Sequence, residues 1–179
     1  MKKNVEGKRV AILATNGFEE SELKSPRAAL IDAGVSVDVV SLNRDAIRGW
    51  SNKNWSDFQP VDRIVSEVKA GDYDMLVIPG GMFNPDTLRT NDDALKFTRD
   101  FFKQHKPVAA ICHGPWLLVE ADLVKSKNVT SYPSIRTDLV NAGGNWQDRT
   151  VVVDGKLITS RNPDDIPNFI DAITQKLSS

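Results

Sequence analysis

The segment Val108-Ala109-Ala110-Ile111-Cys112-His113-Gly114-Pro115 combines a buried strand, a tight turn and the start of a helix. Its four leading apolar residues are typical of a central strand in a parallel sheet, which is covered on both faces. Pro115 has the fixed φ angle that suits the first residue of a helix. Cys112, the only cysteine of the chain, is therefore expected in the turn. Sites of parallel α/β sheets lie at this carboxyl end of the strands.

On both sides of this turn, short apolar runs alternate with longer amphipathic segments, which indicates βαβ units. The expected strands are 9–14, 35–40, 74–79, 108–111 and 128–131, followed by a hairpin of 151–153 and 157–159 around a turn at Asp154-Gly155. The expected helices are 21–33, with a kink or late start at Pro26, and 91–105, 115–123, 134–141 and 162–177. Residues 43–59 are expected to be irregular, with a short strand or hairpin near 61–65. We predict one α/β domain over residues 1–179, a flavodoxin-like three-layer α/β/α sandwich whose mostly parallel sheet carries a nucleophile elbow.

The composition excludes several classes of protein. With 23 basic and 24 acidic residues the net charge is −1, so no long-range field attracts nucleic acid or an anionic membrane. We expect neither a secretory signal nor a membrane span, because no long apolar run occurs. One cysteine excludes an internal disulfide and suits a reducing cytoplasm. One cysteine and two histidines do not make a structural zinc site, and no cofactor is expected.

The position of Cys112 favours a reactive thiol. A strand-to-helix elbow holds a side chain in a strained conformation and points it into a cleft. The helix N-terminus would stabilise a thiolate, so we expect the pKa of Cys112 to be lowered. A buried structural cysteine is the alternative, because cysteine is among the most buried residue types.

Two neighbouring segments could serve this thiol. His113 could be its general base or acid, although adjacent side chains at a turn often diverge, or it could bind substrate or donate its backbone N–H to an oxyanion. The N–H groups of Gly80-Gly81, after the strand 74–79, could form an oxyanion hole with the amide of His113. The alternative for this glycine pair is an ordinary tight turn.

Acidic and aromatic residues follow two other strands. Glu19, Glu20 and Glu22 could be a solvated helix start, or one of them could be a buried, protonated acid that donates a hydrogen bond to sulfur. The residues alone do not choose among the three. Tyr132, before Pro133, could supply a phenol to the same cleft or belong to an ordinary turn.

Four motifs in this order resemble those of the ThiJ/PfpI family, within the class I glutamine amidotransferase-like superfamily, and the PfpI-like branch above all. They are Ala14-Thr15-Asn16-Gly17-Phe18-Glu19-Glu20-Ser21-Glu22, Ile78-Pro79-Gly80-Gly81, Ala110-Ile111-Cys112-His113-Gly114-Pro115 and Thr159-Ser160-Arg161-Asn162-Pro163-Asp164-Asp165. The resemblance extends from about residue 8 to the C-terminus.

The resemblance implies a role for each candidate residue: a nucleophile at Cys112, a carboxyl on its sulfur at Glu22 with Glu19 nearby, a partner at His113, an oxyanion donor at Gly81 and a pocket residue at Tyr132. It also implies self-association as a dimer or larger ring, in which a carboxylate of a neighbouring subunit can complete the site. Residues 43–59 depart from the family pattern, and their Trp50 and Trp55 are expected to pack a long loop against the core.

The resemblance implies a cytoplasmic, cysteine-dependent hydrolase or lyase of stress response and detoxification. Its substrate would be a small aldehyde such as methylglyoxal, as in a cofactor-free glyoxalase, or a glycated adduct, as in a deglycase; the branch also carries a peptidase label. A redox-sensing or chaperone-like stress protein oxidised at Cys112 is the alternative. A flavin-binding protein using Thr15-Asn16-Gly17 as a phosphate loop is disfavoured by the acids that follow.

Overall fold

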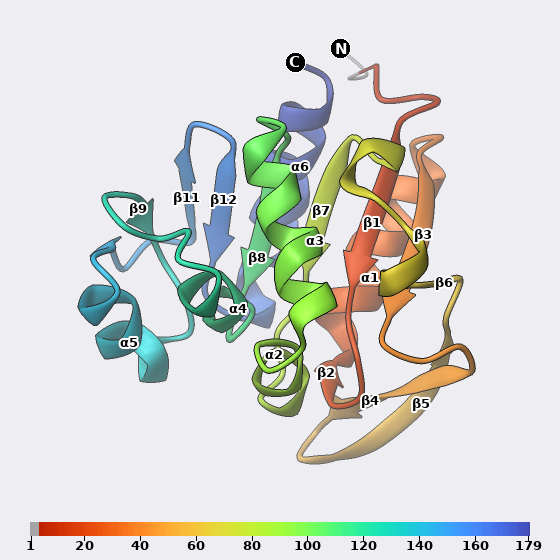
Figure 1. Ribbon diagram of the computed structural model, residues 1–179, viewed down its shortest axis with the longest axis horizontal. Coiled ribbons are helices and arrows are strands. Elements are labelled where there is room, and N and C mark those ends of the chain that lie inside the picture. The colour runs from red at the N-terminus through yellow and green to blue at the C-terminus, as the bar shows by residue number, and fades with distance from the viewer. Residues whose placement is uncertain (1–3) are drawn as a thin grey trace.

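A central sheet of seven strands organises the chain (Figure 1). The computed structural model describes residues 4–179; residues 1–3, part of the start in which no signal sequence is expected, lie outside the described residues. The strands of the main sheet are β1 Arg9–Leu13, β3 Ser36–Ser41, β6 Arg63–Ile64, β7 Met75–Ile78, β8 Val108–Ile111, β11 Val151–Asp154 and β12 Leu157–Ser160. Their spatial order is β11-β12-β8-β7-β1-β3-β6, and only β11 and β12 pair antiparallel.

Helices cover both faces of this sheet. They are α1 Glu20–Asp32, α2 Phe83–Leu88, α3 Asp92–Lys103, α4 Pro115–Glu120, α5 Arg136–Asn141 and α6 Ile166–Leu177, with 3-10 turns η1 Val65–Glu67, η2 Ala70–Asp72, η3 Pro133–Ile135 and η4 Pro163–Asp165. Figure 1 shows α3 in front of the sheet and α1 and α6 behind it. The predicted α/β/α sandwich of flavodoxin-like type is confirmed. No helix of residues 4–179 is long and apolar enough to cross a membrane.

Alternation along the strands divides the apolar side chains between two cores. In β1, Ala11 and Leu13 pack with Phe101 of α3, whereas Val10 and Ile12 pack with Phe169 of α6. All six of these side chains are fully buried. Because both faces of a strand are covered, β1, β7 and β8 read as continuous apolar runs, which is the pattern that predicted them.

Most predicted helices are present. Asn91 caps α3 by accepting a hydrogen bond from the backbone N–H of Ala94 (2.9 Å). Of the kink or late start expected at Pro26, the late start is wrong, because α1 begins at Glu20 and continues through Pro26. Pro26 lies on the buried face of α1, where its ring packs even though proline removes one backbone donor.

The main correction concerns residues 43–59, which are not irregular. They form a hairpin of β4 Ala46–Ser51 and β5 Asn54–Pro60, and β4 also pairs with β2 Phe18–Glu19. Asn52 and Lys53 form the turn with positive φ angles of 50° and 61°, as a type I′ hairpin turn requires. Figure 1 shows this hairpin beyond the carboxyl ends of the main strands.

Two smaller differences lie near the C-terminal strands. Leu157 pairs with Asp154, so the two-residue turn of the last hairpin lies at 155–156, one residue later than expected. The strand expected at 128–131 is only β9 Asn128–Val129, which pairs with β10 Asn145–Trp146 in a separate small sheet. The short strand expected near 61–65 is confirmed as β6.

Candidate active site

Cys112 occupies the turn between β8 and α4, as predicted. Its φ angle is 62°, a left-handed conformation that a non-glycine residue rarely adopts without external support. That support comes from both sides: its N–H donates to the carbonyl of Ser160 (3.0 Å), and its carbonyl accepts from the N–H of Tyr132 (2.8 Å). The turn is thus held between the end of β12 and the segment after β9, and the side chain is only 6% exposed.

The imidazole of His113 turns back toward the sulfur, so adjacency in sequence is no obstacle. Nδ1 lies 3.2 Å from Cys112 Sγ, and Nε2 lies 3.2 Å from the hydroxyl oxygen of Ser134 in η3. The ring of Tyr132 stacks on the imidazole at 4.8 Å, and Trp116 meets it edge-on at 5.2 Å. The aromatic contacts fix the plane of the imidazole, and the two polar contacts fix its rotation. His105, the other histidine, is exposed beyond the end of α3.

Of the three acids of the first turn, the structure buries Glu22. Its side chain is fully buried, and Oε2 accepts the N–H of Gly80 (2.8 Å). Burial raises its pKa to about 8, so the carboxyl keeps its proton at neutral pH. Glu19 is half-buried, and its pKa is raised by burial and by Glu20. Glu20 instead pairs with Lys24 at the surface.

The expected lowering of the pKa of Cys112 is wrong. Burial and the nearby Glu22 raise the pKa of the thiol well above its ordinary value. The backbone amides of Gly81 and His113 hydrogen-bond to the sulfur and act in the opposite direction, without outweighing burial. Cys112 therefore rests as a thiol at neutral pH, and a base is needed to make it nucleophilic.

Gly80 and Gly81 come close to the site because they lack side chains. A Cβ atom on Gly80 would lie 2.5 Å from Glu22 Oε2 and 2.6 Å from Cys112 Cβ. Gly81 has a φ angle of 78°, and a Cβ atom there would lie 2.1 Å from the carbonyl oxygen of Gly17. The N–H of Gly80 is taken by Glu22, so of the pair only Gly81 directs its amide at the sulfur.

Asn84 of α2 is a supporting residue that sequence reasoning missed. It is fully buried, accepts the N–H of Thr15 (2.7 Å) and donates to the carbonyls of Pro79 (3.0 Å) and Gly80 (3.1 Å). It thereby ties the loop after β1 to the loop after β7. Ser134 was also missed. Neither residue belongs to a pattern that the sequence marks, because the contacts are formed between distant segments.

The tryptophans of the hairpin do not pack against the core as expected. Trp50 and Trp55 form an aromatic cluster with Phe83 of α2, with ring centroids 5.5 to 5.9 Å apart. Trp55 is 41% exposed. The cluster joins the hairpin to α2 and so borders the loop that carries Gly81.

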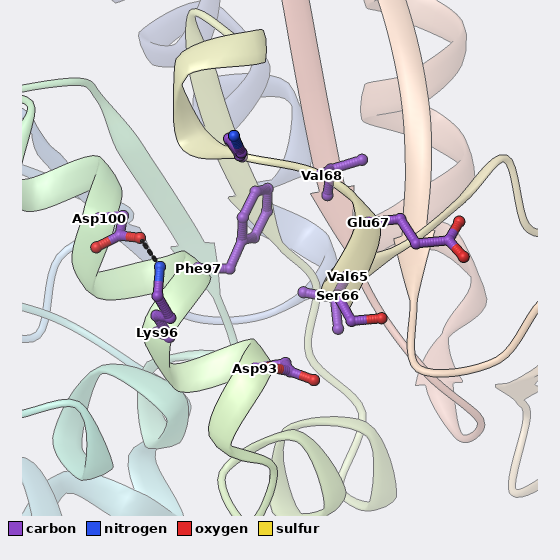
Figure 2. Close-up of a pocket in the computed structure, with 9 residues that line it drawn as sticks. Val65, Ser66, Glu67, Val68, Asp93, Lys96, Phe97 and Asp100 are labelled. Carbon is purple, nitrogen blue, oxygen red and sulfur yellow. Dashed lines mark hydrogen bonds and ion pairs between the residues drawn. The ribbon is translucent and has the colours of Figure 1, made fainter.

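A concave region lies away from the cysteine. Figure 2 shows this cleft of about 250 Å³ between the segment 65–69 and α3. Its Lys96 already pairs with Asp100 (2.6 Å). No residue of the Cys112 site lines it. Within residues 4–179, no three His, Cys, Asp or Glu side chains are grouped to hold a metal ion.

A parallel α/β sandwich with a cysteine at its nucleophile elbow, a histidine on the sulfur and a buried acid beside it defines a class of cysteine-centred α/β proteins. Residues 8–176 match the DJ-1/PfpI family, and the chain belongs to that family.

Similar proteins carry several names. A putative cysteine protease, YraA, of Bacillus subtilis is 44% identical over 162 residues, which are 90% of this chain and 94% of that protein. Protein/nucleic acid deglycase 2 of Escherichia coli is 40% identical over 163 residues, covering 90% and 93% of the two chains. The crystal structure of Drosophila melanogaster DJ-1beta superposes with a TM-score of 0.87 at 31% identity, covering 96% of this chain and 90% of that one.

Proposed function

We propose that this protein is a cysteine-dependent hydrolase or lyase that acts on small aldehydes such as methylglyoxal or on the early adducts they form with amines. The observation that carries the proposal is the contact of 3.2 Å between Cys112 Sγ and His113 Nδ1 at a strained elbow. Such strain persists where the surrounding structure enforces it, and it clusters at active sites.

The first step is the addition of sulfur to the carbonyl carbon. His113 takes the thiol proton through Nδ1 while the S–C bond forms and the carbonyl oxygen becomes an alkoxide. The amides of Gly81 and His113, which already face the sulfur, are placed to donate to that oxygen. Protonation of the alkoxide then gives a neutral hemithioacetal.

The next steps need a group that both gives and takes a proton near neutral pH. Glu22, with a pKa of about 8, meets that requirement. For methylglyoxal, moving the aldehyde hydrogen to the neighbouring carbonyl carbon as a proton turns the hemithioacetal into a thioester of lactate. Water then hydrolyses the thioester and restores the thiol. The net reaction adds one water and needs no oxidant or reductant.

The names of the relatives favour this class and leave the substrate open. The Escherichia coli relative is named a deglycase and the Bacillus relative a putative cysteine protease. Breaking the carbon–nitrogen bond of an aldehyde adduct and hydrolysing a peptide both begin with attack by sulfur on carbon. A cysteine that is 6% exposed admits a small carbonyl compound far more readily than a folded protein.

The redox-sensor alternative is disfavoured by the same geometry. Oxidation by peroxide follows thiolate character and exposure, and Cys112 is buried with a raised pKa. We expect mild peroxide to leave most of Cys112 reduced under conditions that oxidise an exposed thiolate, as read by mass spectrometry.

The proposal is tested by following methylglyoxal loss and lactate formation in the wild type, Cys112→Ala, Cys112→Ser and a surface control, Ser178→Ala. Loss of a nucleophile should reduce turnover by roughly a thousandfold or more. Release of free amine from a glycated amino acid is measured in parallel. Undiminished turnover in Cys112→Ala, or a wild type inactive on both substrates, would overturn the proposed function.

A further inference from the structure

The ring of His113 has two polar contacts, and the second lies on the side away from the sulfur. Nε2 lies 3.2 Å from Ser134 Oγ, while Nδ1 lies 3.2 Å from Cys112 Sγ. Ser134 follows Pro133 in η3, twenty-two residues beyond Cys112, and reaches the ring because the N–H of Tyr132 is bonded to the carbonyl of Cys112. A hydroxyl group can accept or donate a hydrogen bond, so the tautomer of His113 decides what Ser134 does.

Building on the proposed function, we propose that Ser134 is a positioning residue: its hydroxyl oxygen accepts the Nε2–H of His113, which leaves the Nδ1 lone pair directed at the thiol of Cys112. The three side chains then form a chain in which sulfur donates to Nδ1 and Nε2–H donates to Oγ. When the thiol proton moves to Nδ1, the ring becomes an imidazolium, and Ser134 stays hydrogen-bonded to it.

The direction of this chain follows from counting protons. Burial keeps the imidazole neutral at neutral pH by lowering its pKa, so the ring carries one proton. The sulfur keeps its own proton, because burial and Glu22 raise the thiol pKa. The backbone amides of Gly81 and His113 already donate to the sulfur, so the thiol is left to donate its own proton, and Nδ1 at 3.2 Å is placed to accept it. The single proton of the neutral ring then lies on Nε2, facing Ser134.

The titratable groups around the ring are few. Cys112 faces it through the sulfur, and Tyr132 stacks on one side. Trp116 of α4 covers an edge and does not titrate. Glu22 of α1 lies beyond the sulfur, where it affects the thiol. Cys112, Tyr132 and Glu22 are present in both the wild type and Ser134→Ala. A change in the pH profile is therefore attributed to the loss of the Ser134 hydroxyl.

Nuclear magnetic resonance of the unliganded wild type tests the tautomer without any assay of activity. With ¹⁵N-labelled histidine, the two imidazoles are assigned with His105→Gln. We expect a protonated Nε2 and a bare Nδ1 for His113 at pH 7. A predominant Nδ1–H tautomer in the wild type would overturn the proposal.

Variants then connect the tautomer to the thiol. Ser134→Ala removes the acceptor, and Ser134→Thr retains a hydroxyl at an exposed position. Ser178→Ala, at a hydroxyl that bonds only to the carbonyl of Gln175, is the control. Ser134→Ala should give mixed tautomers, a shifted pH profile of Cys112 alkylation by iodoacetamide and a kcat about fivefold lower, as loss of about one hydrogen bond predicts. Ser134→Thr should restore all three.

The outcomes separate this inference from the proposed function. If Cys112→Ala keeps its turnover, the proposed function fails, whereas the tautomer and the alkylation profile still report on Ser134. If Ser134→Ala matches Ser178→Ala in tautomer, alkylation profile and kcat, the inference fails alone. In that case, the specific activity is also measured on dilution. If it falls while Ser134→Ala behaves like the control, the Nε2 contact is assigned to a carboxylate of a second copy instead.

Discussion

Replacing Glu22 by glutamine should change how the stability of the protein depends on pH. The folded chain holds this carboxyl with a pKa of about 8, against an ordinary value of 4.5. Between these values the folded state binds a proton that the unfolded state has lost, so the free energy of unfolding falls as pH rises through that window. A pKa difference of this size corresponds to about 5 kcal/mol over the whole window, of which about 3 kcal/mol is lost by pH 7.

Glu22→Gln keeps an oxygen to accept the N–H of Gly80 and has no proton to lose. Urea unfolding of both proteins is measured from pH 4.5 to 8.5, below the ordinary pKa of the Cys112 thiol. The lowered pKa of His113 affects both curves alike, so it cancels in the difference. Glu19 helps to raise the pKa of Glu22, so the coupling of these two carboxyls is part of the measured difference. We expect the variant to gain about 3–5 kcal/mol relative to the wild type across the range. Parallel curves would refute the burial of an uncharged acid beside the sulfur.

Three further substitutions test the close packing at Gly80, the hydrogen bonds of Asn84 and the turn of the β4–β5 hairpin. Gly80→Ala places a methyl group against Glu22 and Cys112; we expect it to abolish turnover and to cost about 1–3 kcal/mol in urea unfolding, and a fully active variant would contradict the close approach. Asn84→Ala leaves a buried N–H and two carbonyls without their hydrogen-bond partner. Thermal and urea unfolding should show that the free energy of unfolding falls by about 3 kcal/mol, whereas a fall below about 1 kcal/mol would mean that the loops do not depend on Asn84. Lys53→Gly relieves a positive φ in the hairpin turn and should stabilise the protein by about 0.5–1 kcal/mol, and destabilisation in the same assay would argue against a type I′ turn.

The sequence predicted best those strands of the main sheet that are buried on both faces. The strands β1, β7 and β8 are apolar on both faces and stood out as runs. The hairpin β4–β5 is exposed along much of its length, so no apolar alternation revealed it. Its turn uses Asn52-Lys53 rather than an asparagine followed by glycine, which left only half of the usual turn signal.

One signal for Glu22 was present and unused. Glu22, Pro26 and Leu30 are spaced by four residues and share the buried face of α1, while Glu19 and Glu20 fall outside that row. An acid in register with the apolar face of a helix is directed into the core, where only its protonated form is stable. That periodicity distinguishes Glu22 from its acidic neighbours.

The pKa of Cys112 could not be predicted from local sequence, because the dominant influences come from other segments. The sequence shows a helix start after the cysteine, which favours a thiolate. It does not show that a loop after β7 and a helix after β1 close over the sulfur, so burial and a carboxyl outweigh the local effect. The direction of the shift is set by tertiary structure.

The raised pKa of the thiol and the contact with His113 support the same chemistry. Within residues 4–179, no lysine or arginine is among the groups that shift the pKa of Cys112, so a thiolate formed in advance would be held by backbone amides without a side-chain cation. A protonated thiol beside a neutral imidazole carries no charge to stabilise while at rest. In the proposed reaction, charge separates only when sulfur attacks, at the moment when the amides of Gly81 and His113 can donate to the new oxyanion. A site built in this way suits a small, reactive carbonyl compound, whose electrophilic carbon compensates for a nucleophile that must first give up its proton.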